Sequence, residues 1–129
     1  MREPIKDKGR LLHMLDAIDT ILQHAEGITY ENLCANKVLF GGVVYHIVII
    51  GEASHMLTQA FKDAHPETSW KQIKGMRNHI VHGYYTVDPE DVWYVLQHDL
   101  APLREQVVRY ISETDWEAWE KAPQNENKS

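Results

Sequence analysis

Nine consecutive residues, 77–85, hold the side chains of this sequence that are best suited to chemistry. A histidine titrates near neutral pH, so it can either accept or donate a proton. An arginine keeps its charge and can bind two oxygens of one phosphate group. The stretch therefore has the residue types needed to move protons around a bound phosphate. Its polar members are Arg77, Asn78, His79, His82, Tyr84 and Tyr85.

The stretch begins inside a segment whose pattern predicts a helix over residues 70–82. Ser69 followed three residues later by Gln72 predicts a capping box at the start of this helix. Gly83 follows the last helical position and predicts its end. An apolar stripe with spacings of three and four gives the helix a face that packs: Ile73, Met76 and Ile80.

This helix would present the chemical groups near its C-terminal end. Asn78 and His82 are four residues apart, one turn above the other, so Asn78 can hold the His82 ring or bind a phosphate oxygen. Arg77 lies about 7.5 Å before His82 along the axis, and its side chain is long enough to reach toward the same side. The partial negative charge at a helix C-terminus favours a protonated histidine there.

The remaining pattern supplies the elements that must position these groups. Residues 8–25 carry an apolar stripe typical of a bundle helix. Asp88 and Pro89 predict another helix start, and an apolar stripe continues from there to residue 111, with a kink at Pro102. Helices with short links predict an all-α fold, an antiparallel bundle of four to five helices.

Residues 37–62 allow two interpretations. The β-branched run at residues 43–50 is typical of a buried strand. An apolar face with the helical period nevertheless extends over more than twenty positions, which is too long for an ordinary strand. We therefore predict one helix that is apolar on several sides and lies centrally in a bundle or in a dimer interface. Three glycines would permit close helix approach: Gly41, Gly42 and Gly51.

Glu52 is a carboxylate within this apolar segment and needs a partner. It either holds Arg77 in place beside the site, or it is an ordinary ion-paired or exposed glutamate. We predict that residues 1–113 form the helical domain and that residues 114–129 form a polar C-terminal tail, in which Trp116 and Trp119 dock.

Composition limits the function. A net charge of −6 counts against a broad nucleic-acid binder, although one local cationic cleft remains possible. Lys71 and Lys74 could contribute to it, but a solvated helix face is the ordinary interpretation for both. The single cysteine, Cys34, excludes an intrachain disulfide and fits a reducing cytoplasm. The N-terminus does not have the pattern of a signal peptide, and the apolar run at residues 38–50 is too short to span a bilayer, so we expect no membrane association.

The spacing Arg77, four residues, His82, one residue, Tyr84 resembles the R-x4-H-x-Y motif of the HepT-like toxins, which belong to the HEPN superfamily. Asn78 fills a slot that is usually polar. The resemblance covers roughly residues 10–110, and it includes the Gly-Glu-Ala run that contains Glu52.

The resemblance implies a helical bundle and a homodimer with a composite cleft. It implies cofactor-free, metal-independent cleavage of RNA, with Arg77 and His82 catalytic and Asn78, Tyr84 and Glu52 in support. It also implies a partner, a minimal nucleotidyltransferase that acts as antitoxin in a type II or type VII pair and adenylylates Tyr84.

The chemistry gives an independent reason for a dimer. Cleavage through the 2′-hydroxyl needs a base for that hydroxyl and an acid for the leaving 5′-oxygen. The motif supplies one histidine of this kind, His82, so a two-fold axis that brings two such helices together would supply the pair. His79 and His82 are three residues apart and suit a metal, but no third ligand is evident, so we predict no metal site.

Two other classes of function stay open. One is a non-catalytic HEPN-type subunit whose dimer binds a nucleotide or a nucleotidyltransferase. The other is a plain dimeric helical scaffold, in which Arg77 and His82 are structural or solvated.

Overall fold

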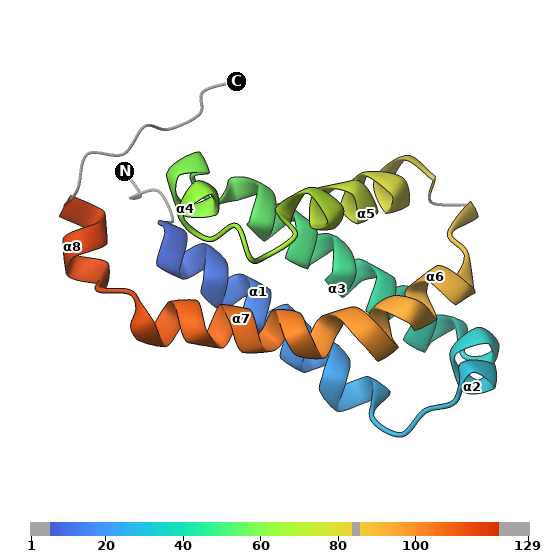
Figure 1. Cartoon of the computed structure of the whole chain (residues 1–129). Coiled ribbons are helices and arrows are strands. Elements are labelled where there is room, and N and C mark those ends of the chain that lie inside the picture. The colour runs from blue at the N-terminus through green and yellow to red at the C-terminus, as the bar shows by residue number, and fades with distance from the viewer. Residues whose placement is uncertain (1–5, 84–85, 122–129) are drawn as a thin grey trace, which may run out of the picture.

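A computed structural model of the chain describes residues 6–83 and 86–121 (Figure 1). No strand occurs among these residues, which confirms the prediction of an all-α bundle. The long segments are α1 (Asp7–Ala25), α3 (Lys37–Met56), α5 (Trp70–His82) and a rod made of α6 (Pro89–Tyr94), η2 (Val95–Asp99) and α7 (Leu100–Glu113). Short helices lie between and after them: α2 (Tyr30–Ala35), α4 (Gln59–Ala64) and α8 (Trp116–Lys121).

The long segments pack antiparallel around α1 and α3. Helix α1 packs along α3 and also along α7, while α5 crosses α3 (Figure 1). The predicted stripe of the first helix faces this core, where Leu11 and Ile18 are fully buried. Helix α5 therefore rests on the outer side of α3, and this contact positions the predicted chemical groups.

The prediction of a single helix over residues 37–62 was wrong, because the helix breaks at residues 57–58. Thr58 caps α4, since its hydroxyl oxygen accepts a hydrogen bond from the Phe61 N–H at 3.2 Å. The buried carboxylate of Asp7 accepts from the Thr58 N–H at 2.8 Å and from its hydroxyl at 2.7 Å. A residue held by its backbone N–H and its hydroxyl in this way cannot continue the α3 hydrogen-bond ladder.

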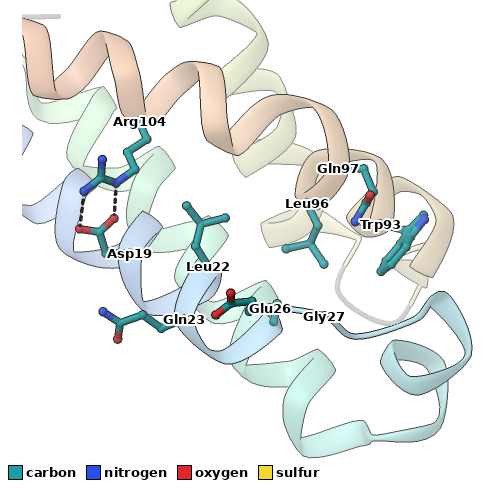
Figure 2. Close-up of a pocket in the computed structure, with 10 residues that line it drawn as sticks. Asp19, Leu22, Gln23, Glu26, Gly27, Trp93, Leu96, Gln97 and Arg104 are labelled. Carbon is teal, nitrogen blue, oxygen red and sulfur yellow. Dashed lines mark hydrogen bonds and ion pairs between the residues drawn. The ribbon is translucent and has the colours of Figure 1, made fainter.

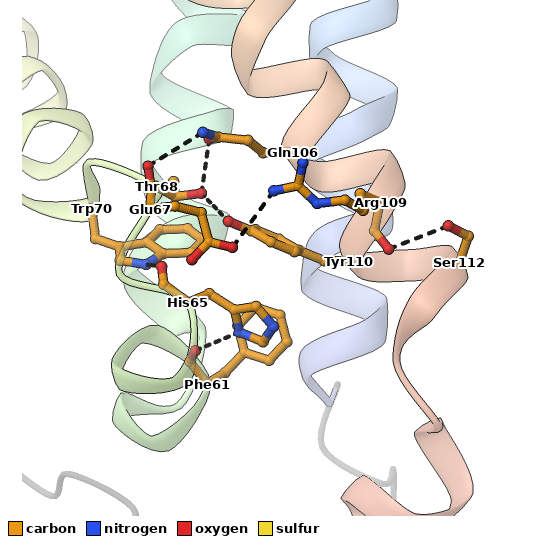
Figure 3. Close-up of polar contacts among 9 residues, drawn as sticks. All are labelled: Phe61, His65, Glu67, Thr68, Trp70, Gln106, Arg109, Tyr110 and Ser112. Atoms are coloured by element: carbon orange, nitrogen blue, oxygen red, sulfur yellow. Dashed lines mark hydrogen bonds and ion pairs between the residues drawn. The ribbon is translucent and has the colours of Figure 1, made fainter.

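The predicted capping box at the start of α5 was also wrong, since the Ser69 side chain makes no capping hydrogen bond. The loop before α5 is held to α7 instead (Figure 3). Thr68 is buried and donates to the Gln106 side chain at 2.8 Å, and its hydroxyl also contacts that of Tyr110. Trp70 donates to the His65 carbonyl at 2.9 Å. Tertiary contacts therefore fix the start of α5.

The rod begins as predicted. The Asp88 side chain accepts from the Glu90 N–H at 2.9 Å, and Pro89 takes the first helical position. Pro102 has no N–H, so it cannot bond the carbonyl four residues earlier. The chain passes through the π-helical turn η2 just before this position, while a kink at Pro102 stays a prediction.

The predicted docking of the two C-terminal tryptophans is confirmed. The Trp116 ring stacks on Phe61 with centroids 6.0 Å apart, and the Trp119 ring meets Phe61 edge-on at 5.6 Å. The Trp119 indole N–H donates to the Asp7 carboxylate at 3.0 Å. Helix α8 thus closes the end of the bundle formed by α1 and α4, while the division of the chain at residue 113 stays a prediction.

Helix α3 is the one described helix that is long and apolar enough to cross a membrane by length and composition alone, with a mean hydropathy of 1.4. Core helices of soluble bundles have the same features. Here α3 packs against both α1 and α5, and its inner face, which includes Val43, Ile47 and Ile50, is buried.

Candidate functional site

Helix α5 approaches α3 most closely where Arg77 meets Gly51. A methyl group added at Gly51 would lie 2.4 Å from Cβ and 2.7 Å from Cγ of Arg77, far inside normal contact. Only a glycine leaves room for the arginine stem there. The predicted role of glycine in close helix approach is confirmed for Gly51, whereas Gly41 and Gly42 are exposed and no described atom lies near them.

Glu52, the next residue of α3, holds the guanidinium of Arg77. One oxygen of its carboxylate accepts from Nε of Arg77 at 2.9 Å and from Nη2 at 2.7 Å. The Arg77 side chain is 25% exposed and that of Glu52 is 48% exposed, so the pair lies at the surface. The predicted Glu52–Arg77 contact is confirmed, while a role in catalysis stays a prediction.

Asn78 completes the setting of Arg77, since its Oδ1 accepts from Nη1 at 2.7 Å. The sequence predicted that the Asn78 amide holds the His82 ring or binds a phosphate oxygen. In the structure the amide oxygen instead accepts a hydrogen bond from Arg77. An arginine has five N–H donors, and these contacts use three. One N–H on each terminal nitrogen therefore stays available to donate to a further acceptor, such as a phosphate oxygen.

His82 is the last residue of α5 and is exposed. Among the described residues its ring has no hydrogen-bond partner. Arg77 does not reach toward it as predicted, but toward α3. Gly83 ends the helix, as expected, and its N–H donates to the His79 carbonyl at 2.9 Å. Tyr84 and Tyr85 lie outside the described residues.

The charge of α5 differs from that of the whole protein. The helix contains Lys71, Lys74 and Arg77 and no acidic residue, so it carries +3 while the chain carries −6. The rest of the chain therefore carries −9. His79 is exposed near the same end as His82. Across residues 6–83 and 86–121, no group of three His, Cys, Asp or Glu side chains is arranged to hold a metal ion.

An exposed apolar stripe lies on α3 beside this site. Val38 is 87% exposed, Tyr45 is 60% exposed and Met56 is 52% exposed. Their spacing puts them on one face of the helix, and Glu52 falls on that same face. Exposed side chains of this size on a single helix face mark a surface that another molecule can cover.

A separate hollow of about 560 Å³ lies between α1 and the α6–α7 rod (Figure 2). Its wall contains an ion pair, in which Nε of Arg104 contacts the Asp19 carboxylate at 2.6 Å, and Trp93 lines the far side. None of the predicted site residues lines it. The pair joins α1 to α7, so its position indicates a structural role.

Sequence reasoning missed one feature that positions the site and found a second. The loop contacts of Thr68 with Gln106 and Tyr110 join residues about forty positions apart, and no local pattern reveals them. The Gly51–Glu52 pair gave a partial signal, because a glycine beside a carboxylate in an apolar helix indicates a close approach and a charged partner. Together these features hold the Arg77 guanidinium against α3, while His82 stands exposed at the end of the same helix, so one helix carries a phosphate-binding group and a histidine.

Comparison with known proteins adds a family to this geometry. Residues 14–110 match the family model described as Ribonuclease HepT-like. The chain is 34% identical over 98 residues to the "Probable ribonuclease HepT" of Thermococcus cleftensis, covering 75% of this chain and 88% of that protein. A "Putative RNase" of Caldanaerobacter subterraneus subsp. tengcongensis is 31% identical over 97 residues, covering 75% and 87%. Another protein of that description, from Methanocaldococcus jannaschii, is 27% identical over 100 residues, covering 78% and 92%. No solved structure gives a significant match.

Proposed function

The chain belongs to the ribonuclease HepT-like family, and from this premise we propose that it is a metal-independent endoribonuclease, the toxin of a toxin–antitoxin pair. One observation carries the proposal. Arg77 is held by Glu52 and Asn78 in a way that leaves one N–H on each terminal nitrogen for a phosphate. The exposed imidazole of His82 ends the same helix.

The proposed reaction is attack of a ribose 2′-hydroxyl on the adjacent phosphorus. A His82 imidazole accepts the proton of that hydroxyl, and a second imidazolium donates a proton to the departing 5′-oxygen. The bond from phosphorus to the 5′-oxygen breaks, and a 2′,3′-cyclic phosphate is left. Arg77 stabilises the negative charge that grows on the phosphate oxygens.

The second imidazole comes from a second copy of the chain in this proposal. Each motif offers one His82, and a two-fold axis pairs identical surfaces. The exposed stripe of α3 supports this arrangement, because it is apolar and carries Glu52, the partner of Arg77. A dimer that covers Val38, Tyr45 and Met56 would place the Arg77–Glu52 pairs of both copies beside the dimer interface.

The antitoxin in this proposal is a minimal nucleotidyltransferase that attaches AMP to Tyr84. Tyr84 follows His82 by two residues, so a nucleotide attached there would stand beside the site. The added phosphate would occupy the free donors of Arg77, and the nucleoside would block RNA. Inhibition would follow from occupancy and would need no refolding.

The test is RNA cleavage by the purified protein in EDTA. We expect wild type to cleave. His82→Ala should lose at least about 10²-fold in rate, as removal of a general acid–base group usually does. Arg77→Ala should lose about as much, because it removes a charge that stabilises the transition state. His24→Ala is the matched control, because His24 is an exposed histidine in the last turn of α1. If wild type does not cleave but binds a nucleotide or the nucleotidyltransferase, the non-catalytic alternative replaces the proposal.

A further inference from the structure

The lysines of α5 extend away from the catalytic groups along the exposed face of the helix. Lys71, Lys74, Asn78 and His82 are spaced by three or four residues, so they lie on one side of α5. Lys71 and Lys74 are exposed, and neither has an ion-pair partner in the part of the chain that the structure describes. Four other cations of the described chain have a carboxylate partner besides Arg77: Lys6, Arg104, Arg109 and Lys121.

The positive face continues past the start of α5 onto α4. Lys62 and Lys71 both line a hollow of about 490 Å³ between the two helices, which is within the size range of small-ligand sites. Burial and the nearby charge of Lys74 lower the pKa of Lys62, so these two ammonium groups are close enough to repel each other. Asp63 is the acidic residue that lines the hollow, and its carboxylate already accepts from Gln59 at 2.9 Å.

Three lysines gathered in this way form a local positive patch in a chain of net charge −6, and an anion bound there would offset their repulsion. A strand of RNA is the anion that fits, because Lys71 and Lys74 share one face of α5 with His82, and Lys62 continues that face onto α4. From Lys71 to His82 the helix rises about 16.5 Å. A stacked strand covers that distance in roughly five nucleotides at about 3.4 Å each.

We propose that Lys71, Lys74 and Lys62 form a phosphate track that holds single-stranded RNA from the cleavage site to the hollow between α4 and α5. The inference rests on the proposed ribonuclease function, since it names the substrate as a strand that extends about five nucleotides beyond the scissile phosphate. The track binds backbone phosphates through ammonium groups, so it contributes affinity and not base specificity.

Binding and cleavage are measured separately to test the track. The binding probe is a fluorescent 12-nucleotide RNA pool of random sequence with 2′-O-methyl groups, which cannot be cleaved through the 2′-hydroxyl. Anisotropy is followed from 50 to 400 mM KCl for wild type, K71Q/K74Q and the matched control K8Q/K37Q. The control removes two exposed lysines that do not line the hollow and have no ion-pair partner among the described residues.

Each phosphate contact on a single strand adds about 0.7 to the slope of log affinity against log salt. We therefore expect the K71Q/K74Q slope to be shallower by about 1.4, and the advantage of wild type to shrink roughly 20-fold over this salt range. The control should keep the wild-type slope. An unchanged slope in K71Q/K74Q, or an equal change in K8Q/K37Q, overturns the track.

The cleavage arm separates this inference from the proposed function. In EDTA, K71Q/K74Q should cleave a dinucleotide as fast as wild type and a 12-nucleotide substrate more slowly. If wild type cleaves, and K71Q/K74Q cleaves both substrates as fast as wild type, the track is rejected and the ribonuclease function is kept. Absence of cleavage by wild type, together with the expected slopes, rejects the ribonuclease and keeps the track. Normal RNA binding by K71Q/K74Q with loss of nucleotidyltransferase binding would assign these lysines to the protein partner and also overturns the proposal.

Discussion

Replacing Gly51 by alanine tests how α3 positions Arg77, the arginine of the proposed site. The new methyl group would lie 2.4 Å from Cβ of Arg77, whereas carbon atoms in contact are normally about 3.5–4.0 Å apart. Cβ is fixed to the α5 backbone and cannot rotate away, so α5 must move by about 1 Å relative to α3. Overpacking of this kind typically costs about 1–3 kcal/mol.

The higher helix propensity of alanine partly offsets this destabilisation. Alanine in the middle of a helix is more stable than glycine by about 0.5–1 kcal/mol. Gly42→Ala isolates that gain, because Gly42 lies in the same helix and no described atom comes within 4 Å of its added methyl group. The difference between the two variants in free energy of unfolding, measured by urea denaturation at equal protein concentration, should therefore be about 1–3 kcal/mol.

Activity should respond more strongly than stability. A misplacement of about 1 Å can cost about 10²-fold in rate, so Gly51→Ala should lose RNA cleavage under conditions where it is still folded. A Gly51→Ala variant that matches Gly42→Ala in stability and wild type in cleavage would refute the argument that this close approach positions Arg77.

Three further substitutions follow from the contacts. Glu52→Gln should reduce RNA cleavage by roughly 10-fold or more. It should change the free energy of unfolding by about 1 kcal/mol or less, because the Glu52–Arg77 pair is partly exposed. Equal effects on cleavage and on the free energy of unfolding would indicate a merely structural ion pair. Asp7→Asn should destabilise by about 1–3 kcal/mol in urea, since Asp7 accepts hydrogen bonds from Thr58 and Trp119 and an amide offers one acceptor oxygen in place of two; the exposed Asp16→Asn on the same helix should change it by about 0.5 kcal/mol or less. Tyr84→Phe, coexpressed with the nucleotidyltransferase, should lack the mass increase of one AMP, and a modification that persists or maps to Tyr85 would contradict the assignment.

Local patterns were enough to predict most of the helices. Gly83 gave the end of α5, and Asp88 with Pro89 gave the start of the rod. The start of α5 was placed at the right residue, but on a capping box that does not form. These signals work because periodicity and capping act within a few residues of one another. The break at Thr58 could not be predicted in this way, because the carboxylate that holds Thr58 comes from Asp7, fifty-one positions away.

The candidate site shows the same limit. Sequence spacing identified Arg77, Asn78 and His82 and offered Glu52 as a partner, and the structure brings Glu52 and Asn78 to Arg77. Spacing did not show that Asn78 turns to Arg77 rather than to His82, since both lie within its reach on a helix. It also favoured a solvated role for Lys71 and Lys74, because their proximity to Lys62 depends on how α4 meets α5.

Cleavage of one defined RNA in EDTA tests the central claim most directly. The substrate is an oligonucleotide that wild type cuts at a mapped position, compared with the same sequence carrying a single 2′-deoxyribose on the 5′ side of that bond. We predict that wild type cuts the all-ribose strand and leaves a 2′,3′-cyclic phosphate, identified by mass spectrometry, and that the deoxy-substituted bond stays intact. Cleavage of the deoxy-substituted bond, or cleavage that appears only when magnesium is added, would contradict a metal-independent attack by the 2′-hydroxyl at the site of Arg77 and His82.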